Sequence, residues 1–210
     1  MYTQTPCLIG LAGQSCAGKN VAADFLAKRN YAVIDADRVT RALLVALAPE
    51  LIDRYAMQAA RQNLRLAKPD GSLDTRALGA LLFADPELLA SHEAFILPKV
   101  EDRIESEIQS FHTQHPDRPI VLNAPTLHKT KLMQRCTFII YIEAPYILRV
   151  MRCKKRDGIP LRAIYARFSQ QKAFLAQYLM QGADIIRVKN RGTPACLEKK
   201  LERILARKGI

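Results

Sequence analysis

The sequence predicts an α/β fold in which helices cover both faces of a parallel β-sheet. Short runs of apolar, β-branched residues alternate along the chain with segments of helical periodicity, which is the pattern of strand–helix–strand units. These runs are apolar on both faces, as expected for strands buried in a parallel sheet. A glycine-rich loop also connects the first run to a helical segment. These three observations place the chain in the α/β class.

The order of the elements predicts five strands and a large helical insertion. The strands are expected at 7–12, 32–36, 119–124, 137–144 and, more weakly, 184–188. Helical patterns occupy 18–29, 38–47, most of 50–112, 145–156, 160–181 and 194–207. The roughly 80 residues between the second and third strands are too many for one crossover helix. We therefore expect one domain over 1–210, with a helical substrate-binding insertion at about 40–115.

The composition is typical of a globular protein of the cytoplasm. With 210 residues, 49% of them hydrophobic and 25% charged, the chain suits one domain with a substantial core. No apolar stretch is long enough to span a bilayer, and the N-terminus lacks the positive region of a signal peptide. The five cysteines form no C-x-x-C pair, which argues against a zinc site or a disulfide framework. We expect no membrane partner and a monomer or weak homo-oligomer.

The positive charge is concentrated near the C-terminus. The net charge is +12, and residues 149–210 hold 16 Lys and Arg against 4 Asp and Glu. Such a field attracts nucleic acid, anionic lipid or a highly phosphorylated small molecule, although part of it is explained by a solvated basic surface. Motifs for RNA stacking are missing from the sequence, and aromatic residues are only 7% of the chain. We therefore expect small phosphorylated ligands and no nucleic acid.

The stretch "GLAGQSCAGKN" at 10–20 has the pattern of a phosphate-binding loop. Its G-x-x-x-x-G-K motif stands between a predicted strand and a predicted helix, where backbone amides, Lys19 and the helix dipole together favour phosphate. The alternative is a glycine-rich structural turn. The residues expected to bind ATP here are Gly13, Ser15, Cys16, Ala17, Gly18, Lys19, Asn20 and Val21. Asn20 stands where a Ser or Thr would help to hold Mg²⁺, and its amide oxygen is a weaker ligand.

Acidic and amide residues follow the next strands. Asp35 and Asp37 come at the end of the second strand, where substrates bind in open parallel sheets. One of them could accept the proton of an attacking hydroxyl or hold a magnesium-bound water; the alternative is a helix cap. Asn123 ends the third strand, where such enzymes often place an Asp that organises Mg²⁺.

The segment 149–171 has the pattern of a mobile lid. Arg149, Arg152 and Arg156 share one face of a helix that ends at Asp157-Gly158, and Pro160 starts a second helix. Arginines carried over the phosphates would neutralise the charge of the transferred group, and the alternative is a solvated basic helix. Arg167 and Gln171 lie four residues apart in the second helix. Beyond the last strand, Asn190 and Gly192 form a loop suited to hold the base or ribose.

Taken together, these segments resemble the dephospho-coenzyme A (dephospho-CoA) kinase family. The matching stretches, in the family's order, are "IGLAG" with "GK", "VIDADRVTR", "DGSLDTRALGALLFADPE", "RDGI" with "ARF..Q", and "ADIIRVKNRGT". The resemblance implies a three-layer P-loop kinase fold with a helical coenzyme-binding insertion and a lid. It also implies transfer of the γ-phosphate of ATP, with Mg²⁺, to the ribose 3′-hydroxyl of dephospho-CoA, the last step of coenzyme A synthesis.

The resemblance also assigns roles to individual residues. It implies that Gly18 and Lys19 hold the ATP phosphates, that Asp37 is the base for the ribose hydroxyl, and that Arg156 is the lid arginine. Asn190 and Gly192 match the adenine pocket. The residues expected to bind the phosphate acceptor are Asp35, Asp37, Arg76 and Arg167.

Three positions depart from the family pattern besides Asn20. Leu97 stands where relatives have a histidine, and Asn123 and Lys129 replace acids near the substrate. These departures leave open an alternative, a catalytically impaired relative that binds nucleotide or coenzyme A. They leave Lys19, Asp37 and Arg156 in place.

Overall fold

The computed structural model describes residues 7–171 and 173–210 and contains the predicted five-stranded sheet. The strands are β1 (Leu8–Gly13), β2 (Ala32–Asp35), β3 (Ile120–Asn123), β4 (Phe138–Glu143) and β5 (Ile185–Lys189). Their order is β2-β3-β1-β4-β5, and every neighbouring pair is parallel. The predicted strand boundaries are therefore confirmed to within one residue. β3 is buried along its length and β4 is buried up to its last residue, the half-buried Glu143, in agreement with their apolar character on both faces.

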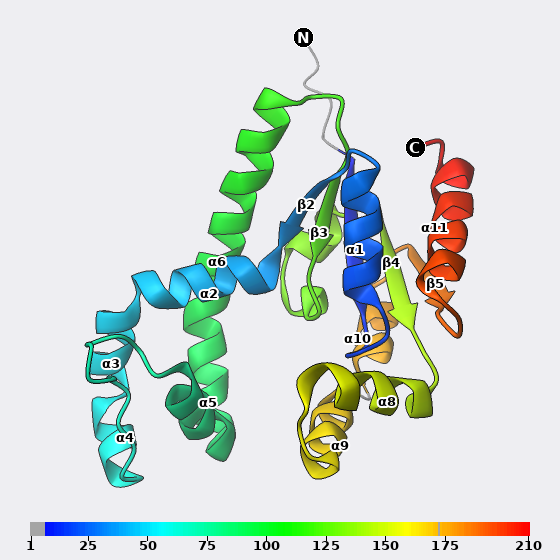
Figure 1. Cartoon of the computed structure of the whole chain (residues 1–210). Helices are drawn as coiled ribbons and strands as arrows, with labels where there is room; N and C mark the ends of the chain where they lie inside the picture. The colour runs from blue at the N-terminus through cyan, green and yellow to red at the C-terminus, as the bar shows by residue number, and fades with distance from the viewer. Residues whose placement is uncertain (1–6, 172) are drawn as a thin grey trace. The chain divides into compact units, whose positions relative to one another are not determined.

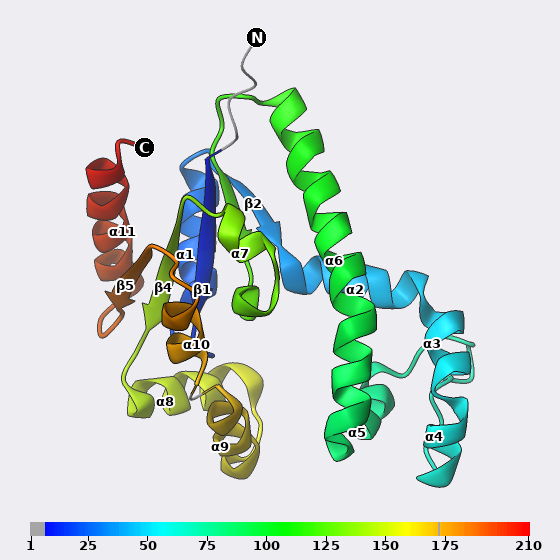
Figure 2. The same cartoon turned by 180° about the vertical axis from the view of Figure 1, so that it is seen from behind.

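The chain forms two compact units. One consists of the residues up to Asp35 together with Glu107–Ile210, and the other is Ala36–Ser106. In the first unit, α1 (Lys19–Lys28) and α11 (Pro194–Lys208) cover one face of the sheet, while α7 (Leu132–Arg135) and α10 (Phe174–Met180) lie on the other (Figures 1 and 2). This unit therefore has three layers, as expected.

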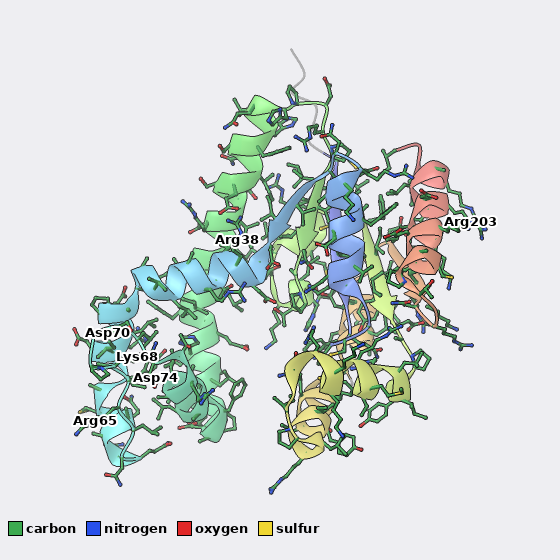
Figure 3. The ribbon with its side chains drawn as sticks, viewed as in Figure 1. Arg38, Arg65, Lys68, Asp70, Asp74 and Arg203 are labelled. Atoms are coloured by element: carbon green, nitrogen blue, oxygen red, sulfur yellow. The ribbon has the colours of Figure 1, made fainter. Side chains whose placement is uncertain are left out.

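Alternating side chains of the sheet build the core of the first unit. Ile9, Leu11 and Ile140 are fully buried beneath Leu26 of α1 and Leu201 of α11. The opposite surface of α11 is basic, and Arg203 points away from the sheet (Figure 3). A short 3-10 helix, η1 (Leu127–Lys129), connects β3 to α7.

The predicted lid segment is confirmed as helical, with one difference. The helix α8 (Tyr146–Asp157) ends at Gly158, which has a positive φ of 63°, and Pro160 precedes α9 (Leu161–Gln170). The single helix predicted over 160–181 is wrong, because α9 and α10 are separate. They pack against different partners: Ile164 and Phe168 of α9 contact Cys153, whereas Tyr178 of α10 lies against Tyr141 beneath the sheet.

The second unit is a small helical body with its own core. It contains α2 (Ala36–Ala46), α3 (Ala48–Arg54), α4 (Ala56–Arg61), α5 (Thr75–Ala84) and most of α6 (Pro86–Gln114). Its core includes Leu51, Tyr55 and Leu81, and buried His92 hydrogen-bonds Tyr55 at 3.0 Å. The non-helical stretch before α5 carries Arg65, Lys68, Asp70 and Asp74 (Figure 3). Among the described residues, no helix combines the length and apolar character needed to cross a membrane.

Candidate active site

The phosphate-binding loop connects β1 directly to α1, as the sequence predicts. Gly13 and Gly18 have positive φ angles of 150° and 107°, which favour glycine. A Cβ atom on Gly13 would lie 2.3 Å from the carbonyl oxygen of Ile142, and one on Gly18 would lie 2.4 Å from Nδ2 of Asn190. Both glycines of the motif are therefore required by the backbone conformation and by the close approach of neighbouring segments.

The Gly18→Ala variant is expected to lose nucleotide affinity. The added Cβ would meet Asn190 and force the loop out of its conformation, at a stability cost of about 1–3 kcal/mol. Urea unfolding and displacement of a fluorescent ATP analogue would measure the two effects. Gly71→Ala is the matched control, because Gly71 has a φ of 79° but a Cβ added there would meet nothing within 4 Å. It should lose stability and keep nucleotide affinity; wild-type affinity in Gly18→Ala would contradict the argument.

A hydrogen-bonded bridge connects Lys19 to the end of β2. Nζ of Lys19 donates to Oδ1 of Asn123, and Nδ2 of Asn123 donates to Oδ2 of Asp35 at 3.2 Å. The strand register explains this contact, because Asp35 and Asn123 are direct partners in the β2–β3 pair. Asn123 is 3% exposed, so its amide is fixed within the sheet edge. The structure thus brings Lys19 and Asp35 together through Asn123, which was noted from the sequence only as an uncharged residue in the place of an expected acid.

Two of the three predicted lid arginines contact the carbonyl groups of the loop. Nε of the buried Arg149 donates to the carbonyl oxygen of Ser15 at 2.9 Å, and its guanidinium lies 4.0 Å from the ring centroid of Phe168. Burial lowers the pKa of Arg149. Arg152 donates to the carbonyl oxygens of Ala17 at 3.5 Å and Gly192 at 3.2 Å. The predicted basic face therefore meets the phosphate loop.

Arg156 and Arg167 share one carboxylate. Arg156 donates to both oxygens of Asp157, at 2.6 Å to Oδ1 and 3.1 Å to Oδ2, and Arg167 donates to Oδ2 at 2.6 Å. The hydrogen bond from Arg156 holds the pKa of Asp157 well below its usual range, and Arg167 adds to the effect. No ion pair was predicted for Asp157 from the sequence. Its position next to Arg156, and ten residues before Arg167 in a segment of two paired helices, was a signal for one.

Cys16 of the loop lies beside this ion pair. Side-chain atoms of Cys16, Cys153 and Asp157 lie within 4.8 Å of one another. Burial raises the pKa of Cys153 to about 11, so this thiol stays protonated at neutral pH. Because two arginines already bind Asp157, this cluster is a poor site for a cation.

The remaining residues predicted to bind ATP lie in or beside the loop. Asn190 is buried, and its Nδ2 donates to the carbonyl oxygen of Ala17 at 2.7 Å. Gly192 contributes the carbonyl that Arg152 contacts. Cys16 has a positive φ of 61°, Val21 packs against the core, and Asn20 is exposed in the first turn of α1. Asn190 thus contacts the loop directly, whereas Gly192 is connected to it through Arg152, and the contact of both residues with the base stays a prediction.

Two predicted substrate residues belong to the second unit. Asp37 lies in the first turn of α2, two residues after β2 ends. Arg76 is exposed in the first turn of α5, where Asp74 accepts from the backbone amides of Arg76 at 2.9 Å and Ala77 at 3.0 Å. The local structure therefore places Asp37 directly after the carboxyl end of a parallel strand and holds Arg76 in a capped helix start.

Comparisons with known proteins point to one family. The family model for dephospho-CoA kinase matches residues 7–195. The dephospho-CoA kinase of Treponema denticola is 46% identical over 205 residues, which are 98% of this chain and 92% of that protein. A crystal structure from Thermus thermophilus superposes with a TM-score of 0.78 at 26% identity, covering 97% of this chain and 98% of that one. The dephospho-CoA kinase from Campylobacter jejuni shares the fold, with a TM-score of 0.70 at 20% identity over 96% of both chains.

Proposed function

This chain is a member of the dephospho-CoA kinase family, and we propose that it transfers the γ-phosphoryl group of ATP to the ribose 3′-hydroxyl of dephospho-CoA. The observation that carries the proposal is the match of the family model over residues 7–195, which includes both the phosphate loop and the helical unit. The hydrogen bonds from Lys19 to Asn123 and from Asn123 to Asp35 support the proposal. They connect the lysine expected to bind phosphate with the end of β2, two residues before the proposed base Asp37.

The loop and the lid would supply the electrostatic part of the reaction. Phosphoryl transfer spreads negative charge over the oxygens of the transferred group, so catalysis depends on positioning and on fixed positive charge. Lys19 and the backbone amides at the start of α1 would hold the ATP phosphates. Arg152 and Arg156 would neutralise developing charge, Arg156 after exchanging Asp157 for a phosphate oxygen. Arg167 would keep the carboxylate of Asp157 paired during that exchange.

Asp37 would act as the base for the acceptor hydroxyl. A carboxylate at the end of a parallel strand is suited to accept this proton as the ribose oxygen attacks the γ-phosphorus. Asp35, Arg76 and Arg167 would each contribute to the binding of dephospho-CoA, as the family resemblance implies. Asn190 and Gly192 would border the adenine of ATP.

The donor set beside Lys19 fits Mg²⁺, which ATP-dependent phosphoryl transfer generally uses. Magnesium requires oxygen ligands and commonly takes one or two carboxylates together with phosphate oxygens and water. Asp35 provides a carboxylate next to Asn123, and Asn20 provides an amide oxygen one residue after Lys19. We propose that these two side chains hold the ion, directly or through its waters. When bound, Mg²⁺ would neutralise part of the negative charge of the ATP phosphates.

The substrate assignment is tested by measuring ADP release with several alcohols in parallel. A coupled assay with ATP and Mg²⁺ would offer dephospho-CoA, free nucleosides and shikimate as acceptors. We expect turnover with dephospho-CoA and a product phosphorylated at the 3′-position, identified by mass spectrometry and phosphorus NMR. Turnover with only one of the other alcohols would overturn the assignment.

We also propose that the protein works in the cytoplasm on small molecules, as a monomer or weak homo-oligomer. The five cysteines are free thiols, which suits a reducing compartment. Sedimentation analysis across a concentration series would measure the oligomeric state, and filter binding of an oligonucleotide at low salt would test for nucleic-acid affinity.

A further inference from the structure

Ser15 of the phosphate loop is held by the lid segment through three hydrogen bonds. Its backbone N–H donates to Oε1 of Gln171 at 2.9 Å, and its Oγ accepts from Nε2 of Gln171 at 2.7 Å. Its carbonyl oxygen accepts from Nε of Arg149 at 2.9 Å. Gln171 stands at the C-terminal cap of α9, and Arg149 belongs to α8. Every polar group of Ser15 therefore contacts the lid.

The geometry fixes the orientation of the Gln171 amide. A backbone N–H can only donate, so the atom that faces the Ser15 nitrogen must be the amide oxygen. The NH₂ group must then face the Ser15 hydroxyl and donate to it. Because Oγ accepts this hydrogen bond, its own proton points away from Nε2 and is left to donate in another direction.

Ser15 is also prevented from rotating as a whole. Arg149 is 5% exposed and lies against Phe168, so the guanidinium that binds the Ser15 carbonyl is fixed. The N–H of Ser15 is occupied by Gln171. The group that Ser15 can offer to a phosphate oxygen, which only accepts at neutral pH, is therefore its hydroxyl.

We propose that Gln171 is a positioning residue that turns the Ser15 hydroxyl into a hydrogen-bond donor for an ATP phosphate. Gln171 acts through Ser15. Because Gln171 belongs to the lid segment, the position of the lid determines whether the Ser15 hydroxyl donates toward the phosphate. The inference rests on the proposed kinase function, in which the loop holds ATP. It assigns to Gln171 a role distinct from that of Arg167, its neighbour four residues earlier in the segment, which pairs with Asp157.

A double-mutant cycle tests the coupling. Ser15→Ala and Gln171→Leu are each expected to lower kcat/KM for ATP on the order of tenfold, because a hydrogen bond to a charged group is lost. The double variant should lose about the same tenfold, since the two side chains act as one unit. KM for dephospho-CoA should stay at the wild-type value. Gln177→Leu, an exposed glutamine of α10, is the matched control and should retain wild-type constants.

A second variant separates orientation from general damage to the loop. Gln171→Glu keeps the shape, but both carboxylate oxygens accept, so the Ser15 O–H would turn toward Glu and away from ATP. We expect Gln171→Glu to weaken ATP binding more in the wild-type background than in the Ser15→Ala background, where there is no hydroxyl to turn. Displacement of a fluorescent ATP analogue measures this without an acceptor, so it stays informative if the dephospho-CoA assignment fails.

Three outcomes would overturn the inference. The first is a roughly hundredfold loss in the double variant, which would mean independent contributions. The second is wild-type ATP affinity and kcat/KM in Gln171→Leu. The third is a parallel rise of KM for ATP and dephospho-CoA with a lowered melting temperature, which would identify a purely structural role.

Discussion

Replacement of Asp37 by asparagine is expected to lower kcat with dephospho-CoA by roughly 10²–10⁴-fold, the range that a general base contributes. Asparagine keeps the shape of the side chain but cannot accept the proton of the ribose hydroxyl. KM for ATP should change little, because the phosphate loop and Lys19 belong to a different part of the chain. Steady-state kinetics with both substrates varied would measure the two effects separately.

The matched control for this variant is Asp24→Asn. Asp24 is an exposed acid in α1, so its neutralisation changes the net charge equally without touching the proposed base. Its kcat should equal that of the wild type. Near wild-type turnover in Asp37→Asn would eliminate Asp37 as the base and would direct attention to Asp35, two residues earlier.

Replacement of Lys19 by methionine is expected to lower kcat/KM for ATP by about 10²–10³-fold, comparable to the loss of one oxyanion-stabilising donor. The variant removes the positive charge at the phosphates. It also leaves Oδ1 of buried Asn123 without its donor, so the amide that binds Asp35 loses its anchor. Kinetics and displacement of the fluorescent ATP analogue would show the loss in both binding and turnover.

Lys28→Met provides the comparison for Lys19→Met. Lys28 is exposed in the last turn of the same helix, where its charge gives only a small favourable interaction with the helix dipole. Its kcat/KM for ATP should match the wild type. An equal effect of the two variants would show that the loss reflects overall charge or helix stability, and the assignment of Lys19 to the phosphates would then be wrong.

The sequence was informative wherever the signal is local. The strands followed from short apolar runs, and the phosphate loop followed from glycine spacing between a strand and a helix. The break at Gly158 and the start after Pro160 followed from the backbone preferences of those residues. Each of these features depends on neighbours within a few positions, which is why the pattern alone located them.

Contacts across the fold could not be predicted in the same way. The Asn123–Asp35 contact depends on β3 lying beside β2, which no run of residues specifies. Gln171 and Ser15 are 156 positions apart, and their contact requires the turn of α9 over the loop. From the sequence, Asn123 was therefore noted only as an uncharged residue in place of an acid. Its hydrogen bonds to Lys19 and Asp35 were not predicted.

The buried contact between Asn190 and Ala17 has a consequence for biosynthesis. The loop is synthesised before Asn190, which follows the edge strand β5 and lies 173 positions after Ala17. The nascent loop lacks the side chain that holds its Ala17 carbonyl until synthesis has passed Asn190. Premature termination before β5 therefore removes this hydrogen bond from the phosphate loop.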